Sequence, residues 1–253
     1  MVEQLVAIAK PWCEEFRPAR CGIGFGGPVL YDRQRVALST HVEGWSDYPL
    51  VDELQARLGI PCVMDNDANV GALGEAYHGA GRGYDPLFYM TISTGIGGGI
   101  VIGGEVYRGA DSMAGEIGHT TVRPDGPQCL CGAYGCLERM CSGLWLERDY
   151  RRPAEVLFED PEFVRRYVVD LARGIKNCIM LLNPARVVIG GGISKAGERL
   201  FEPLRRELGI QITSWARARV DVVPAALGDD SVLWGAKVLA EKRAREWTAC
   251  QVE

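Results

Sequence analysis

Segments with short apolar runs, as in strands, alternate along the chain with segments whose apolar residues have helical spacing. Runs of strand length, rich in β-branched and aromatic residues, fall at 21–27, 61–67, 87–93, 99–107, 186–192 and 219–226. Helical periodicity falls at 2–16, 49–58, 69–78, 161–182, 195–208 and 231–247. Strands that alternate with helices are typical of a layered α/β protein, so we expect that class rather than a helical bundle.

Proline and glycine positions refine this pattern. Pro11 should end or bend the first helix, and a polar connection should run from the first strand to Trp45. The TGIGG sequence at 94–98 predicts a glycine hairpin between two strands. Glycine-rich residues 79–85 predict a boundary or hinge, which divides the chain into segments 1–85 and 86–253.

Charge and cysteine content exclude some functional classes. The net charge of -5 gives no electrostatic reason to expect nucleic acid or an anionic membrane as a partner. No apolar run approaches the roughly 18 residues of a membrane span, and the N-terminus does not resemble a signal peptide. Nine cysteines are an odd number without an export signal, which favours free thiols in a cytoplasmic protein over a disulfide framework.

One cysteine-rich segment has the spacing of a metal site. His119, Cys129, Cys131 and Cys136 follow the pattern H-x9-C-x-C-x4-C. Three thiolates and one imidazole complete a tetrahedron and leave no position for water, which is typical of structural rather than hydrolytic zinc. We therefore predict one structural Zn²⁺; the alternative is a cysteine-rich loop that holds no metal.

Four further clusters carry polar or glycine residues at places where ligands bind, and each also has a purely structural interpretation. Asp65–Asn66–Asp67 follows an apolar strand, where it could present a catalytic carboxylate or form a helix cap. The run 93–99 could cradle a phosphate or only turn the chain, and Gly190–Gly192 could face a ligand or only pack. Glu116 and Glu138 flank the cysteine loop, where they could bind a polyhydroxyl ligand or lie in solvent.

Five motifs in this order resemble the ROK family of repressors, open reading frames and sugar kinases. They are NDAN (66–69), STGIGGG (93–99), GEIGH (115–119), CLCGAYGCLE (129–138) and VVIGGG (187–192). The resemblance covers about residues 20–240. It implies an actin-like, hexokinase-type ATPase fold related to ribonuclease H, whose two α/β domains close on ATP and a hexose. Residues 1–85 would form a small, incomplete domain and 86–253 a large one, with the last helix returning to the small domain.

The resemblance also implies roles for individual residues. Asp67 would be the catalytic base for a sugar hydroxyl. Sugar contacts would come from Gly27, Asn66, Glu116, His119 and Glu138, phosphate contacts from Thr94, Gly95, Gly97 and Gly98, and the adenosine side from Gly190, Gly191 and Gly192 with 228–240. His119 would use one ring nitrogen for zinc and the other for the sugar. The expected ligands are ATP with Mg²⁺ and a hexose or N-acetylhexosamine, and the expected assembly is a homodimer.

One departure from the family pattern changes the functional expectation. Family kinases begin with a strand and a D-x-G-G-T hairpin that contacts ATP phosphates and magnesium, and nothing before Cys21 resembles it. We therefore expect an incomplete phosphate clamp, through a truncated start or through loss from an active ancestor. The leading hypothesis is a glucokinase-like sugar kinase; the alternatives are a sugar-binding pseudokinase and a transcriptional regulator, although residues 1–20 are too short for a helix-turn-helix.

Overall fold

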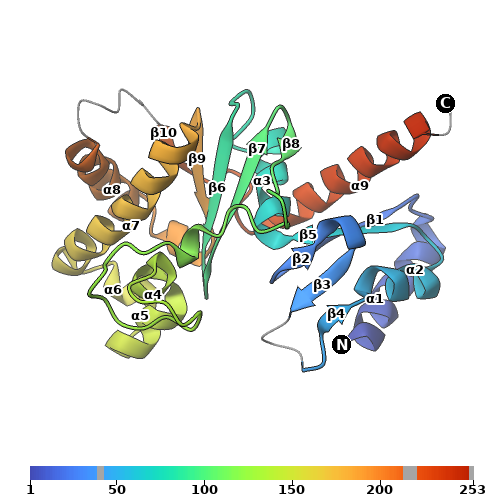
Figure 1. Ribbon diagram of the computed structural model, residues 1–253, viewed down its shortest axis with the longest axis horizontal. Coiled ribbons are helices and arrows are strands. Elements are labelled where there is room, and N and C mark those ends of the chain that lie inside the picture. Colours follow the sequence, from blue (N-terminus) through green and yellow to red (C-terminus); the bar gives the residue numbers. More distant parts are fainter. Residues whose placement is uncertain (39–42, 213–220, 251–253) are drawn as a thin grey trace.

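The chain forms two α/β lobes (Figure 1). The computed structural model describes residues 1–38, 43–212 and 221–250. The N-terminal lobe lies on the right of the view and the C-terminal lobe on the left, with helices α3 and α9 between and above them. We propose that these lobes are the two domains expected on either side of residue 85.

The N-terminal lobe is built on two small sheets. Its parallel pair consists of β1 (Cys21–Phe25) and β5 (Cys62–Asn66), and its antiparallel sheet of β2 (Val29–Leu30), β3 (Arg35–Leu38) and β4 (Ser46–Tyr48). Two helices complete the lobe, α1 (Val2–Phe16) and α2 (Leu50–Leu58). Val36, Leu50 and Met64 are almost fully buried at its centre, so burial of apolar surface fixes the position of β5 within the lobe.

The C-terminal lobe is built on a five-stranded mixed sheet of order β10-β9-β6-β7-β8. Its strands are β6 (Leu87–Ile92), β7 (Ile96–Ile102), β8 (Glu105–Val106), β9 (Arg186–Gly190) and β10 (Asp221–Pro224). Helices α4 (Leu137–Cys141), α5 (Gly143–Tyr150), α6 (Ala154–Leu157), α7 (Pro161–Leu182) and α8 (Glu198–Gln211) cover one side. Because β6 and β9 are parallel, their carboxyl ends meet at one edge of the sheet.

Two helices join the lobes. Helix α3 (Asp67–His78) packs against the central strands β6 and β7, and α9 (Ser231–Cys250) crosses α3 and packs on β1. The crossing is close because both helices present glycine there. An added Cβ at Gly235 would overlap the carbonyl oxygen of Val70, and one at Gly74 would overlap that of Ser231. The last helix therefore returns to the N-terminal lobe (Figure 1).

Replacing Gly235 with alanine should destabilise the protein by about 1–3 kcal/mol, because the new methyl group forces α9 away from α3. Urea unfolding of the purified variant measures this change. Gly209→Ala is the matched control, since Gly209 lies in helix α8 and an added Cβ there meets nothing within 4 Å. Because alanine has a higher helix propensity than glycine, Gly209→Ala should leave the free energy of unfolding unchanged or slightly raised. An unchanged unfolding midpoint for Gly235→Ala would contradict the close crossing.

A buried carboxylate fastens the end of α3. Glu75 is fully buried, and its oxygens accept hydrogen bonds from the backbone N–H groups of Ala80 (2.7 Å), Ala226 (3.1 Å) and Leu227 (3.0 Å) and from the hydroxyl of Ser231 (2.8 Å). These four donors replace the water that the carboxylate loses on burial. The segment after α3 and the segment before α9 thus meet at one side chain.

The predicted elements agree with the structure in order, and the predicted glycine hairpin joins β6 to β7. The bounds of four segments differ from the prediction. Helix α1 does not end at Pro11 and continues to Phe16. The connection after β1, predicted to be irregular, contains three short strands. The helix predicted for 195–208 begins at Glu198. Strand β7 begins at Ile96, inside the expected TGIGG turn. Residues 219 and 220 of the predicted strand 219–226 lie outside the described residues.

Within the described part of the chain, no helix combines the length and the apolar character needed to cross a bilayer.

Candidate active site and metal centre

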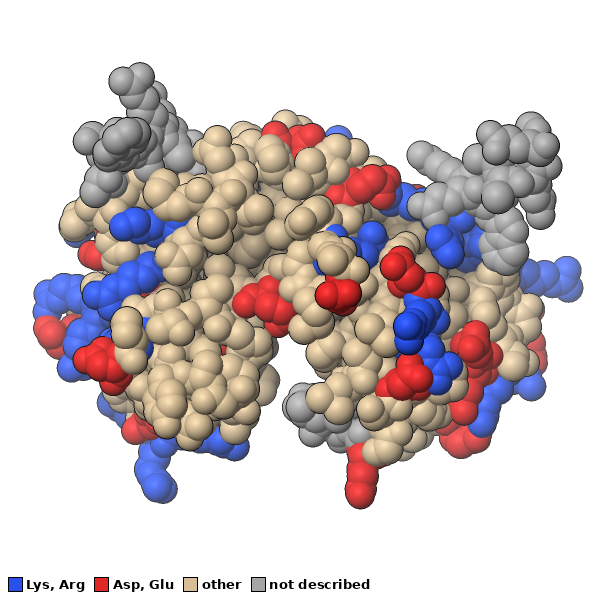
Figure 2. Space-filling model, viewed as in Figure 1, with Lys and Arg blue, Asp and Glu red and all other residues tan. Residues whose placement is uncertain are grey.

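The carboxyl ends of β1 and β5 lie at the cleft and carry the first candidate residues. The cleft opens between the lobes in Figure 2. Asn66 caps α3: its side-chain oxygen accepts from the N–H groups of Ala68 (3.0 Å) and Asn69 (3.4 Å), and its amide donates to the Gly27 carbonyl (3.0 Å). The side chain of Asn66 therefore ties the turn after β1 to the start of α3.

Asp67 is the first residue of α3 and faces that same turn. One carboxylate oxygen accepts from the N–H of Ala68 at 2.8 Å. The other oxygen would lie 3.6 Å from a Cβ placed on Gly26, so it points toward the glycine turn. Burial raises the pKa of Asp67, and the hydrogen bond from Ala68 lowers it to a smaller extent. The structure thus holds one carboxylate oxygen available to a ligand in the cleft.

Asp65, two residues earlier, has a structural task. It is only 1% exposed, and Arg108 donates to its Oδ2 at 2.8 Å. Its Oδ1 accepts from the side-chain amide of Asn69 at 3.0 Å. The Arg108 guanidinium also stacks on the ring of Tyr31, 3.5 Å from its centre. Sequence reasoning missed this pair because Asp65 and Arg108 are far apart in the chain.

Three carboxylates, those of Asp67, Glu116 and Glu138, act on one another's charge, and we call them the acidic wall. His119 lies beside Glu116. The Glu116 Oε2 lies 4.0 Å from the Nε2 of His119. Burial raises the pKa of Glu116, the charge of His119 lowers it, and the negative charges of Glu138 and Asp67 raise it further. The charges of Glu138 and Asp67 both act on Glu116, so these carboxylates lie near one another. Such a set of acceptors can hold the hydroxyl groups of a polar ligand.

Glu138 has a second contact that its sequence position did not reveal. Its Oε2 accepts from the N–H of Ile96 at 2.9 Å, immediately after the turn between β6 and β7. A Cβ on Gly95 would lie 2.7 Å from the same oxygen, which explains the need for glycine there. Glu138 therefore connects the acidic wall to the glycine turn.

The glycine run itself divides into a turn and a packed strand. Ser93 and Thr94 are exposed in the turn with Gly95, whereas Gly97, Gly98 and Gly99 lie inside β7. An added Cβ on Gly97 or Gly99 would crowd Ala68 of α3, and one on Gly98 would crowd the Gly115 carbonyl. The close approach of α3 to β7 thus accounts for part of the run, and the turn remains free to face an anion.

The carboxyl ends of β6 and β9 border a second cavity, of about 200 Å³. Gly190 ends β9, and Gly191 follows with a φ of 82°, a conformation that glycine adopts without strain. The cavity is lined by Ser93, Gly143, Ala154, Glu155, Phe158, Gly192, Ile193, Lys195, Ala196 and Arg199. Lys195 forms an ion pair with Asp229 (2.8 Å). This contact places the start of segment 228–240, which was expected on the adenosine side, next to the cavity. Lys195 and Gly143 had no sequence signal of their own, whereas Ser93 begins the 93–99 motif.

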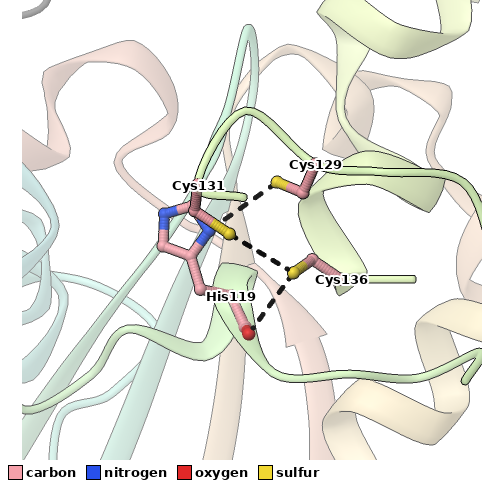
Figure 3. Close-up of side chains that lie close together, drawn as sticks. All are labelled: His119, Cys129, Cys131 and Cys136. Carbon is pink, nitrogen blue, oxygen red and sulfur yellow. Dashed lines mark hydrogen bonds between the residues drawn. The ribbon is translucent and has the colours of Figure 1, made fainter. Parts of the chain in front are cut away.

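The four predicted metal ligands converge (Figure 3). One ligand atom from each of His119, Cys129, Cys131 and Cys136 lies within 4.8 Å of the others. The Nδ1 of His119 lies 4.0 Å from the sulfur of Cys129, and the sulfurs of Cys131 and Cys136 are 3.6 Å apart. Tetrahedral zinc with three thiolates places its sulfurs about 3.8 Å apart, so the donor set fits structural Zn²⁺.

The fold and site together define a protein class. Two α/β lobes around a cleft, with a glycine turn and a carboxylate at its walls, form the actin-like ATPase fold. The sequence profile of the ROK family matches residues 1–243, and this chain belongs to that family.

The similar proteins include both glucokinases and repressors. A glucokinase of Thermotoga maritima is 37% identical over 251 residues, covering 87% of this chain and 79% of that protein. A putative xylose repressor of a Caldicellulosiruptor species is 35% identical over 233 residues, covering 79% and 58%. A glucokinase from Streptomyces griseus, solved with glucose and AMPPNP, superposes with a TM-score of 0.82 at 31% identity, covering 95% and 87%.

Proposed function

We propose that this chain phosphorylates a hexose hydroxyl with ATP, as a glucokinase-like sugar kinase. The observation that carries the proposal is the placement of Asp67, which starts a helix at the cleft with one carboxylate oxygen directed at the glycine turn after β1. Phosphoryl transfer depends mainly on positioning and charge stabilisation, and a carboxylate beside the hydroxyl orients it and accepts its proton. The similarity to two glucokinases supports this reaction class.

The surrounding groups divide into a sugar side and a nucleotide side. Glu116 and the free ring nitrogen of His119 would receive sugar hydroxyls, together with the remaining oxygen of Glu138. Gly27 and Asn66 would shape the turn below the sugar.

Thr94 and Gly95 would face the phosphates from the turn. The adenosine would lie in the cavity beside Gly192, and bound Mg²⁺ would neutralise charge on the phosphates. The four-residue cluster would hold Zn²⁺, which would fix the orientation of the His119 ring.

A steady-state assay with glucose, ATP and Mg²⁺ tests the proposal. Zinc-loaded protein should form sugar phosphate in a reaction that requires both glucose and ATP. Omission of Mg²⁺ should abolish the signal. Binding of glucose by calorimetry without any turnover would overturn the kinase assignment and support a non-catalytic sugar-binding protein.

A regulator is the second candidate, and the similarity to the putative xylose repressor favours it. In that case the same cleft would bind a sugar as a signal, and occupancy of the sugar site would not depend on ATP. Titration of the protein with xylose and glucose, with and without AMPPNP, separates the two. A kinase should bind both glucose and the nucleotide analogue, whereas a regulator should bind sugar alone.

A further inference from the structure

Two free cysteines face each other at the end of the β1–β5 pair that lies away from the cleft. Cys21 and Cys62 are register partners on these parallel strands, and both thiols are free and half-buried. Neighbouring strands lie about 4.8 Å apart, and partners in register project to the same face. Disulfides span Cα separations of about 4.4–6.8 Å, so the backbone already holds the pair at bonding range.

Side chains brace the outer edge of β5 and hold Cys62 in place. The Gln55 side-chain oxygen accepts from the N–H of Cys62 at 3.0 Å. The Gln34 amide accepts from the N–H of Met64 at 2.7 Å and donates to its carbonyl at 3.2 Å. Since these bonds fix the strand on its second edge, the Cys62 thiol is presented from a rigid frame.

One thiol of the pair borders a cavity, and the two thiols act on each other. A cavity of about 160 Å³ reaches Cys62 and is lined by Arg20, Asp52 and Arg243 among other residues. Cys21 does not line this cavity and is half-buried. The neighbouring Cys62 thiol lowers the pKa of Cys21 to about 7, and the same contact raises the pKa of Cys62. Two arginines outnumber the one aspartate in the cavity wall, and cysteines beside positive charge and a hydrogen-bonding neighbour react more readily as thiolates.

We propose that Cys21 and Cys62 form a redox dithiol that hydrogen peroxide oxidises to a disulfide and that a dithiol reductant restores. The Cys21 thiolate attacks one peroxide oxygen and breaks the O–O bond, which gives a sulfenic acid and a hydroxide that takes up a proton to become water. The Cys62 sulfur then displaces the sulfenic oxygen, which leaves as a second water with the Cys62 proton. The two sulfurs lose two electrons, and the peroxide gains them.

The disulfide would join the two strands that lead to the sugar side of the cleft. Strand β1 runs into the Gly26–Gly27 turn, and β5 runs into Asp67. A bond between their first residues would close the chain from 21 to 62 into one loop, and it would restrict the unfolded state. Oxidised protein should therefore melt several degrees higher than reduced protein.

Peptide mapping of the zinc-loaded, 253-residue chain tests the proposal. After a few equivalents of hydrogen peroxide and blocking of free thiols, we expect a linked peptide pair that contains Cys21 and Cys62 and is lighter by two hydrogens. Dithiothreitol should restore both thiols. In Cys62→Ser the resolving thiol is lost, so Cys21 should accumulate as a sulfenic acid that dimedone traps. In Cys21→Ser, Cys62 should remain a thiol.

A matched control and two adverse outcomes complete the test. Burial raises the pKa of Cys178 to about 12, so Cys178→Ser should leave the linked pair unchanged. Peroxide that leaves Cys21 and Cys62 as available to alkylation as in untreated protein would overturn the proposal. Linkage of either residue to Cys13, in place of the Cys21–Cys62 bond, would overturn it as well.

Discussion

Replacing Asp67 with asparagine should lower kcat by about 10²–10⁴-fold and change glucose affinity by no more than a few fold. Asparagine keeps the size of the side chain and its acceptor for the Ala68 N–H, but it cannot take the proton of the attacking hydroxyl. The loss should therefore fall on the chemical step. Steady-state kinetics for kcat and calorimetry for glucose binding measure the two effects separately.

The pH dependence gives the same prediction a second readout. The base acts only when ionised, and burial raises the pKa of Asp67 above its ordinary value of 3.8. The kcat of the unmodified protein should therefore fall as pH drops through this raised pKa, at a higher pH than an exposed aspartate would give. The residual activity of Asp67→Asn should lose that acid limb.

Asp52→Asn is the matched control for both readouts. Asp52 also lies in the first turn of a helix of the N-terminal lobe, but it is exposed. Its substitution should leave kcat and the pH profile as they were. An active preparation whose rate survives Asp67→Asn would show that another group takes the proton.

Loss of one metal ligand should have the second large effect. Structural zinc contributes about 10–16 kcal/mol of binding free energy, which here would organise the loop that carries His119. The Nδ1 of His119 faces the sulfurs and its Nε2 faces Glu116. Cys136→Ser should therefore purify without stoichiometric zinc and bind glucose about 10–100-fold more weakly, with AMPPNP affinity changed only a few fold.

Elemental analysis and calorimetry check this expectation, with Cys13→Ser as control because Cys13 lies in α1, outside the metal cluster. The control should retain zinc and unmodified affinities. Unmodified protein that carries no zinc would contradict the metal assignment. Zinc-free protein that binds glucose at full strength would instead show that the metal does not position His119.

Much of the fold could be predicted because its strands carry strong local signals. The apolar runs at 87–93 and 186–192 appear as the central strands β6 and β9, since a sheet covered by helices needs continuous β-branched and aromatic residues. The convergence of His119 with three cysteines was also predictable, because all four lie within a stretch of 18 residues, 119–136.

The rest depends on contacts between distant residues, which no local pattern encodes. Strands β2 and β4 have two and three residues, too few to show an alternation. Glycines in β7 resemble a turn in sequence, yet they serve the approach of α3. The contact of Glu138 with Ile96 and the pairing of Asp65 with Arg108 join residues 42 and 43 positions apart.

The carboxylate of Glu75 has a consequence for motion between the lobes. The chain passes between them after α3 and again before α9, and both passages are hydrogen-bonded to this one side chain. If the two connecting segments were anchored separately, each could bend independently. Because both are hydrogen-bonded to Glu75, they should move together about one point. Opening and closing of the cleft should therefore be a rotation about the end of α3 near Glu75. Asp67 lies at the other end of this helix, so the rotation should displace Asp67 more than residues near Glu75.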